Sequence, residues 1–127
     1  MAALADSFAA PAVAGLRLET SQALEALERA QWIAFAPFVF QAARVLRDRG
    51  VLLAIEQARG GLTLEEVAAK VELPIYGTRV LLEAGLGIGL LTEVDRRYRL
   101  TKTAVFLQHD PMTRANMDFT RDVNYLG

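Results

Sequence analysis

The residues from Glu83 to Gly89 carry the clearest sign of cofactor chemistry in this chain. They place an acidic side chain before three glycines at alternate positions, Gly85, Gly87 and Gly89. Such glycines let a backbone approach a bound cofactor, provided that a strand leads into the loop and a helix leaves it. The order is reversed in this chain, because a helical pattern comes first and a strand pattern follows. The run therefore predicts a turn from a helix into a strand, and we assign no cofactor-binding residues to it.

His109 is the single histidine, and it stands beside Asp110. A histidine oriented by a carboxylate can act as a general base. Asp110, however, precedes Pro111, and this pair is typical of a helix cap followed by a proline in the first turn. With no second histidine and no cysteine, the sequence offers no histidine or cysteine metal site and no recognisable Ser/His/Asp set. We assign no catalytic and no metal-ligating residues.

Four aromatic residues lie close together: Trp32, Phe35, Phe38 and Phe40. On a helix they cover more than one face. They either pack inside one small core or form an interface between subunits. Because a helix that is apolar on several sides needs several partners, we predict that they form a dimer interface.

The elements that must position these residues are short helices and one hairpin. Thr63 precedes Glu66 by three residues, which predicts a capping box at the start of a helix over 64–71. A second helix begins near Ile75, and Gly85 is expected to end it. Residues 91–94 and 98–101 alternate apolar and polar side chains around a tight turn at 95–97. This order predicts a winged helix-turn-helix with a small β-hairpin wing.

Further helices are expected on both sides of this motif. A helix from about Ser21, capped by Thr20 or Ser21, is interrupted or kinked at Pro37, and a separate helix follows over 38–49, with Arg44, Arg47 and Asp48 on its polar face. Residues 51–58 are a helical neighbour. Thr101 caps a helix through Leu107, and Asp110 caps one that runs to about Tyr125. The prediction is a mainly α fold.

Composition narrows the possible partners. Hydrophobic residues make up 53% of the chain, which excludes a disordered protein. The 14 Lys and Arg residues are balanced by 15 Asp and Glu residues, so the chain has no net positive charge to attract the phosphate backbone of a nucleic acid. No apolar run approaches the ~20 residues of a membrane-spanning helix. The lack of cysteine and of a basic N-terminal segment is compatible with a cytoplasmic protein, which we expect.

DNA binding is the alternative function. The expected second helix of the motif offers Tyr76, Thr78 and Arg79, and a basic wing with Arg96, Arg97 and Arg99 could lie along a phosphate backbone. The rest of that helix is Glu83 and aliphatic residues. Nucleic acid is therefore not expected as a partner, and a winged-helix transcription regulator is kept as the runner-up.

Three stretches together carry a family resemblance: Val80–Leu90, Tyr98–Leu107 and Met112–Phe119. As an ordered set they resemble the N-terminal region of class I S-adenosylmethionine-dependent methyltransferases of the small-molecule O-methyltransferase type. The resemblance covers about Phe38 to Gly127. It implies flanking dimerisation helices, an intertwined homodimer, and a winged helix that roofs the pocket of a small-molecule substrate. It also implies a separate C-terminal domain that binds S-adenosylmethionine and supplies the catalytic residues.

The alanine-rich N-terminal residues 1–19 are expected to form a flexible arm, and 20–110 the dimerisation domain. The resemblance implies that 111–127 begin a connecting helix toward a catalytic domain that is missing from this chain, and it implies a substrate site on this helix. The chain is therefore expected to be truncated. Asn116, Phe119 and Tyr125 are the expected pocket residues, although helix packing for Phe119 and Tyr125 and surface exposure for Asn116 explain them equally well. A standalone S-adenosylmethionine binder is a third hypothesis.

Overall fold

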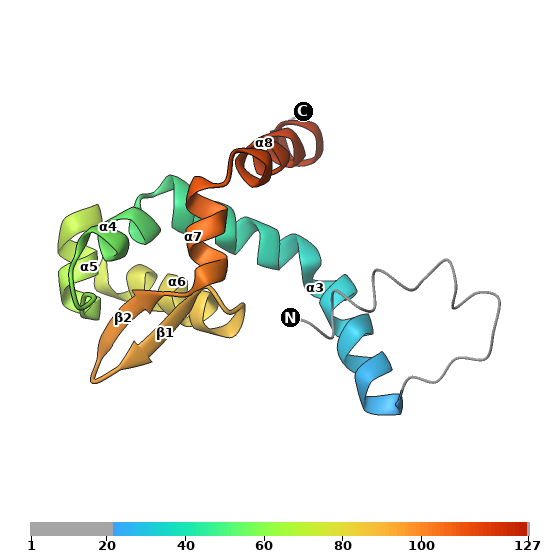
Figure 1. The fold of residues 1–127 in the computed structure, drawn as a ribbon, viewed down its shortest axis with the longest axis horizontal. Helices are drawn as coiled ribbons and strands as arrows, with labels where there is room; N and C mark the ends of the chain where they lie inside the picture. Colours follow the sequence, from blue (N-terminus) through green and yellow to red (C-terminus); the bar gives the residue numbers. More distant parts are fainter. Residues whose placement is uncertain (1–21, 127) are drawn as a thin grey trace. The chain divides into compact units, whose positions relative to one another are not determined.

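The computed structural model of the chain describes residues 22–126. The chain divides into two units, Met1–Pro37 and Phe38–Gly127. The described part of the first unit is helical, and the second unit holds the remaining elements (Figure 1). The expected flexible arm over 1–19 and the expected caps at Thr20 and Ser21 lie outside the described residues.

Helices dominate the described chain. In sequence order the elements are α3 (Ala23–Asp48), α4 (Val51–Gln57), α5 (Leu64–Val71), α6 (Ile75–Gly87), β1 (Leu91–Val94), β2 (Arg97–Leu100), α7 (Lys102–His109), α8 (Pro111–Thr120) and the π-helical segment η1 (Arg121–Leu126). The predicted mainly α fold with a small hairpin is confirmed. None of the described helices has the length and apolar character needed to cross a bilayer.

The expectation of separate helices before and after Pro37 is wrong. One helix, α3, is assigned from Ala23 to Asp48 with Pro37 inside it. Proline cannot donate a hydrogen bond to the carbonyl one turn earlier, on Ile33. Ile33 is exposed as a residue, and an unpaired carbonyl costs less where water can reach it than in a buried position.

Local capping chemistry fixes where α5 begins. The Thr63 hydroxyl accepts a hydrogen bond from the Glu66 N–H at 3.2 Å, and the Thr63 N–H donates to Glu66 Oε1 at 2.9 Å. These are the two reciprocal bonds of a capping box. The prediction of this cap from residue spacing is confirmed, as are the bounds of α5.

The prediction that Gly85 ends its helix is wrong. Helix α6 continues to Gly87, and Gly85 is buried inside it. A Cβ atom at position 85 would lie 2.6 Å from Cδ1 of Leu91, so glycine allows the helix and the hairpin to pack without displacing that side chain. The chain leaves the helix at Gly89, whose φ of 81° favours glycine.

The hairpin forms largely as predicted, with β2 beginning one residue early at Arg97. Strands β1 and β2 are antiparallel and pair Leu91 with Leu100 and Val94 with Arg97. Asp95 and Arg96 make the turn, both at positive φ, as a two-residue type I′ turn requires. The loop before α5 adds an isolated bridge between Leu62 and Tyr98.

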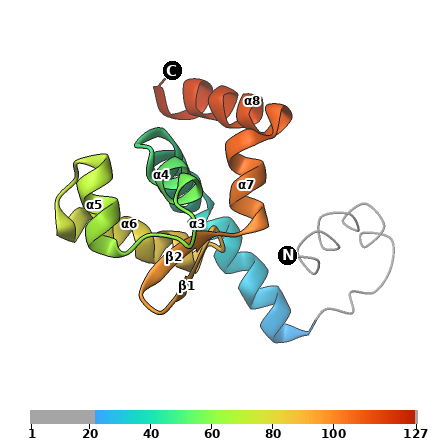
Figure 2. The same ribbon diagram turned by 60° about the vertical axis from the view of Figure 1, so that its left-hand side comes forward.

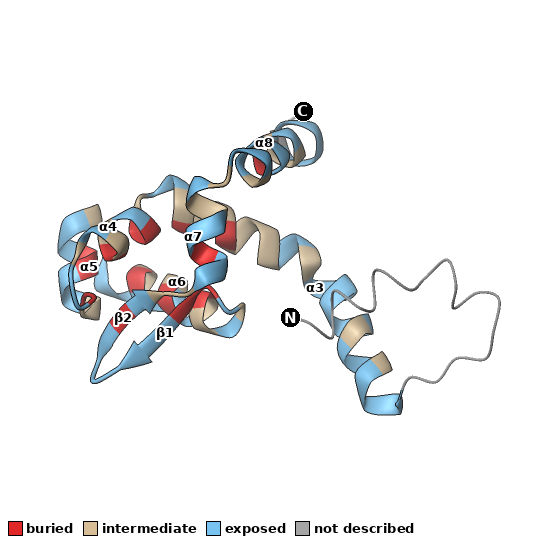
Figure 3. Ribbon diagram, viewed as in Figure 1, coloured by how far each residue is buried: buried red, intermediate tan, exposed pale blue. Residues whose placement is uncertain are grey.

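The core of the second unit lies between α4, α5, α6, the hairpin and α7 (Figure 3). Its fully buried side chains include Leu46, Leu52, Ile55, Val67 and Leu82. Both ribbon views show α7 leading from the hairpin to α8 (Figures 1 and 2). Helix α8 comes after these elements in the sequence, and it contributes one residue, Met117, to the core.

Candidate self-association surface and C-terminal helix

In the first unit, α3 exposes large apolar side chains. Trp32 is 41% exposed, Phe35 53% and Ile33 65%. Residues 33 and 35 leave the helix on different sides, so the apolar character is not confined to one stripe. Exposed apolar area of this kind is typical of surfaces that associate with another chain.

In the second unit, the same helix carries the other two predicted interface residues. Phe38 is 71% exposed, whereas Phe40 is half-buried. The ring of Phe40 stacks on the ring of Tyr125 in η1, with centroids 5.3 Å apart and planes inclined by 10°. The structure thus brings together a predicted interface residue and a predicted pocket residue.

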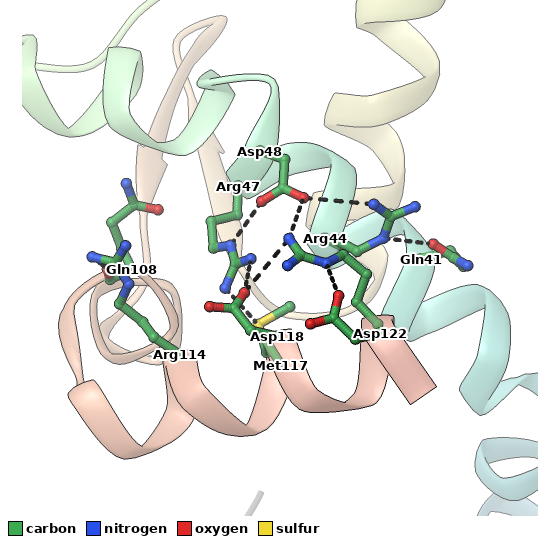
Figure 4. Close-up of polar contacts among 10 residues, drawn as sticks. Gln41, Arg44, Arg47, Asp48, Gln108, Arg114, Met117, Asp118 and Asp122 are labelled. Atoms are coloured by element: carbon green, nitrogen blue, oxygen red, sulfur yellow. Dashed lines mark hydrogen bonds and ion pairs between the residues drawn. The ribbon is translucent and has the colours of Figure 1, made fainter. Parts of the chain in front are cut away.

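A cluster of arginines and aspartates joins the C-terminal end of α3 to α8 (Figure 4). Arg47 Nη2 donates to Asp118 Oδ1 at 2.7 Å, and Arg47 Nε donates to Asp48 Oδ1 at 3.0 Å. Arg121 lies 3.7 Å from Asp118 and 4.0 Å from Asp48. The Arg47 side chain is only 10% exposed. A charge with so little access to water is costly unless it is paired, and the carboxylates of Asp118 and Asp48 provide that pairing.

The contacts between α3 and the C-terminal segment follow one register. Phe40 and Arg47 are two helical turns apart on α3, and their partners Tyr125 and Asp118 are also about two turns apart. The later residue of α3 contacts the earlier residue of the C-terminal segment. The two segments therefore run antiparallel, with an ionic contact at one end and an aromatic contact at the other.

The charges in this cluster stabilise one another. Burial lowers the pKa of Arg47, but its hydrogen bonds to Asp118 and Asp48 outweigh burial, so the net effect raises that pKa. The hydrogen bond from Arg47 also holds the pKa of Asp118 below its usual value. Both groups are therefore charged near neutral pH. Sequence analysis placed Arg47 on a polar face and did not find its partner, because that partner is distant in sequence.

Helix α8 presents a second face. Met112, Asn116 and Phe119 are exposed and follow helical spacing, and Val123 in η1 is exposed as well. The three α8 residues lie across the helix from Met117 and Asp118, which contact Arg47 of α3. Of the three predicted pocket residues, Asn116 and Phe119 thus share the outward face. Tyr125 lies apart from them, on the side stacked against Phe40.

Asp110 and His109 have different roles. Asp110 caps α8: its Oδ2 accepts from the Thr113 N–H at 2.8 Å, and the two bonds from Thr113 lower the pKa of Asp110. His109 is the last residue of α7, which runs two residues beyond its expected end at Leu107. Its Nε2 lies 2.7 Å from Oε2 of Glu56 in α4. Sequence analysis missed this pair, since no short-range pattern links the two residues.

The glycine run lies where a helix leads into a strand, and one arginine of the wing makes a tertiary contact. Gly85 and Gly87 lie in α6, with β1 after them, the reverse of a strand-to-helix cofactor loop. Arg97 Nη1 donates to Glu66 Oε1 at 3.2 Å and to the carbonyl of Gly61 at 3.3 Å, so one of the three arginines near the wing ties the hairpin to α5. Within residues 22–126, no group of three or more His, Asp or Glu side chains could hold a metal ion.

A comparison with protein families matches residues 28–98 to the Dimerisation2-like domain. The match begins within α3 and ends in β2, so it takes in all four predicted interface aromatics. A search of curated proteins finds no match for the chain.

Solved structures share the fold. SibL, described as an S-adenosylmethionine-dependent methyltransferase in its apo form, is 25% identical with a TM-score of 0.67, covering 78% of this chain and 30% of that chain. LepI in complex with SAM is 16% identical with a TM-score of 0.67, covering 91% of this chain and 28% of that one. A structure described as a pericyclic reaction enzyme is 16% identical with a TM-score of 0.66, covering 91% and 29%. The chain thus spans about 30% of the length of these proteins.

Proposed function

Because the chain belongs to the Dimerisation2-like domain family, the N-terminal domain of O-methyltransferases, we propose that it is the dimerisation and substrate-capping domain of a methyltransferase. The family match carries this proposal, since it spans a helix with exposed aromatic side chains. The partner is a second copy of the chain. Catalysis belongs to a separate domain, and this chain supplies no catalytic residue.

The proposed domain map assigns residues 20–110 to the winged-helix dimerisation domain and 111–127 to a connecting helix. The cap at Asp110, directly before α8, supports a boundary there. The helix and hairpin order of α5, α6, β1 and β2 supports the winged-helix assignment. Residues 1–19 remain a predicted arm.

For the substrate pocket we propose Asn116, Phe119 and Tyr125. Asn116 and Phe119 are exposed on one face of α8, where an amide and an aromatic ring can together contact a small molecule. Tyr125 is 37% exposed and is proposed to contribute through the edge that its stack on Phe40 leaves accessible.

In the whole protein, S-adenosylmethionine is proposed to bind in the catalytic domain and to donate its methyl group to a small molecule. The relation to SibL, an S-adenosylmethionine-dependent methyltransferase, supports this choice. A relative described as a pericyclic reaction enzyme has the same fold, so the reaction itself depends on residues outside this domain. A cytoplasmic location remains part of the proposal.

Self-association is testable on the chain itself by sedimentation equilibrium. We expect the unchanged chain to show twice its mass of 13.9 kDa. Burial of apolar surface stabilises an interface by ~25 cal/mol per Å². Replacement of Trp32 and Phe35 by serine removes such surface from the proposed interface, so this variant should show the mass of a single chain.

A matched control replaces two exposed apolar residues of α6, Tyr76 and Val80, by serine. This control should keep the doubled mass. The dimer proposal fails if the unchanged chain is monomeric, or if the variant at positions 32 and 35 keeps the mass of the unchanged chain.

A further inference from the structure

Helix α8 is held against α3 differently from the way the other helices of the second unit are held together. Among its described residues only Met117 belongs to the buried core. The side-chain contacts of α8 with α3 come from Arg47, which reaches Asp118 and the sulfur of Met117. In the following segment η1, Arg121 lies 4.0 Å from Asp48 and Tyr125 stacks on Phe40. Helix α8 also contacts α7, where Arg114 Nη1 donates to the carbonyl of Gln108 at 3.5 Å. A helix with so little buried apolar area depends on such contacts for its orientation.

The ionic contact has the geometry of a strong one. Arg47 Nη2 lies 2.7 Å from Asp118 Oδ1, and Arg47 Nη1 lies 3.8 Å from Met117 Sδ. One guanidinium thus contacts two successive residues of α8 that point toward α3 (Figure 4). Because guanidinium donors are planar and fixed in direction, contacts to two neighbouring positions define the rotation of the helix about its axis.

We infer that Arg47 is a positioning residue which, together with the stack of Phe40 on Tyr125, sets the rotation of α8 and so decides which side chains that helix exposes. One part of this inference rests on the proposed function: the exposed face of α8 carries Asn116 and Phe119, so the rotation of α8 affects a substrate pocket only if those residues line one. Arg47 acts on the pocket through α8 and is not itself a contact residue.

The neighbouring charges make Arg47 central to the cluster. Asp48 accepts from Arg47 at 3.0 Å and lies 3.6 Å from Arg44, while Arg121 bonds Asp122 at 3.0 Å. Arg121 reaches Asp118 only at 3.7 Å, with a side chain 28% exposed. Loss of Arg47 therefore leaves Asp118 with a weaker and more hydrated partner.

Hydrogen exchange on the 127-residue chain tests the inference. In Arg47→Met and in Asp118→Asn, the amides of Pro111–Thr120 should exchange at least about tenfold faster than in the unchanged chain, as expected for loss of a charged hydrogen bond that limits local opening. The amides of α5 and α6 should keep their rates. Arg47→Lys, which retains the charge but has no planar group to contact both Met117 and Asp118, should restore the protection only in part.

Arg97→Met is the matched control, because it breaks the ion pair with Glu66 in the same unit without touching α8. It should leave exchange in α8 unchanged. Equal rates in α8 for the unchanged chain, Arg47→Met and Asp118→Asn would overturn the inference, as would acceleration by Arg97→Met of the same size. If Arg47→Met does not fold, Asp118→Asn alone decides, since the Asp118 side chain is 46% exposed.

Thiol labelling is a second measurement of how α8 lies against α3, and it reports only the introduced position because the chain contains no cysteine of its own. A cysteine at Met117 faces α3, and one at Asn116 faces outward. The additional change Arg47→Met should increase labelling at 117 by about tenfold and leave labelling at 116 unchanged. An unchanged rate at 117 would contradict the inference.

The same samples distinguish this inference from the proposed function. The contacts of Arg47 lie within one chain, so faster exchange in Arg47→Met supports the inference even when sedimentation shows a monomer. Conversely, a dimer whose α8 exchanges equally with and without Arg47 overturns the inference and leaves the proposed self-association standing.

Discussion

The contact of Gly85 with Leu91 and the contact of Arg47 with Asp118 position neighbouring parts of one unit by different means. At Gly85 a Cβ would lie 2.6 Å from Leu91 Cδ1, so even one additional carbon would displace the Leu91 side chain. At Asp118 the carboxylate is nearly half exposed and is held by a guanidinium 2.7 Å away. The contact between α6 and the hairpin is therefore one of close packing, whereas the contact of Asp118 with α3 is ionic.

This difference predicts which perturbations each region resists. Close-packed apolar contacts respond to a change of volume and hardly at all to pH. An ion pair with a half-exposed carboxylate responds to pH, because protonation of the carboxylate removes its charge. The contact of Gly85 with Leu91 and the contact of Arg47 with Asp118 are therefore expected to be disrupted by different changes, the first by a change of side-chain volume and the second by a change of charge.

The largest expected effect is in the core. Leu82 is fully buried in α6, so Leu82→Ala leaves a cavity and should lower the free energy of unfolding by about 2–5 kcal/mol. Urea unfolding followed by circular dichroism measures this change. Val80→Ala, on the exposed side of the same helix, should change the value by less than ~0.5 kcal/mol. Equal effects at the two positions would contradict the burial of Leu82.

The next effect tests close packing of helix and hairpin. Gly85→Ala forces Leu91 to move, and we expect a loss of about 1–3 kcal/mol in the free energy of unfolding. Gly87→Ala is the matched control in the same helix, because a Cβ at that position has no neighbour within 4 Å. It should be neutral or stabilising by up to ~1 kcal/mol. A neutral Gly85→Ala would show that the contact with Leu91 relaxes freely.

The smallest effect concerns acid pH and α8. Because the hydrogen bond from Arg47 lowers the pKa of Asp118 below its usual value of 3.8, Asp118 stabilises the folded state above that value. This contribution is lost as the pH falls through the folded-state pKa. Amide protection in α8 should therefore differ between the unchanged chain and Asp118→Asn at pH 6, and the difference should decrease as the pH falls below 3.8. A difference that does not decrease in that range would exclude ionisation of Asp118 as its cause.

Asp110 and Glu66 also have lowered pKa values, and both cap helices. They contribute to acid unfolding with the same sign. Because both carboxylates remain in the Asp118→Asn variant, the comparison of the two chains isolates the contribution of Asp118.

Much of the fold could be predicted because its signals are local. The caps at Thr63, Thr101 and Asp110 each bond a backbone N–H three residues later, so a short stretch of sequence contains both partners. Alternation over 91–94 and 98–101 likewise predicted the hairpin from its own residues. The errors at Pro37 and Gly85 came from applying local rules where exposure to water, or packing against Leu91, decided the outcome.

The sequence by itself determined the helices, their caps, the hairpin and the aromatic character of α3, because each depends on residues within a few positions. Only the tertiary structure decided that Arg47 meets Asp118, that Phe40 stacks on Tyr125, and that His109 meets Glu56. It also separated Asn116 and Phe119 from Tyr125. Such pairs join residues that are distant in sequence, and the packing of the whole unit, rather than any local pattern, sets which side chains come within reach.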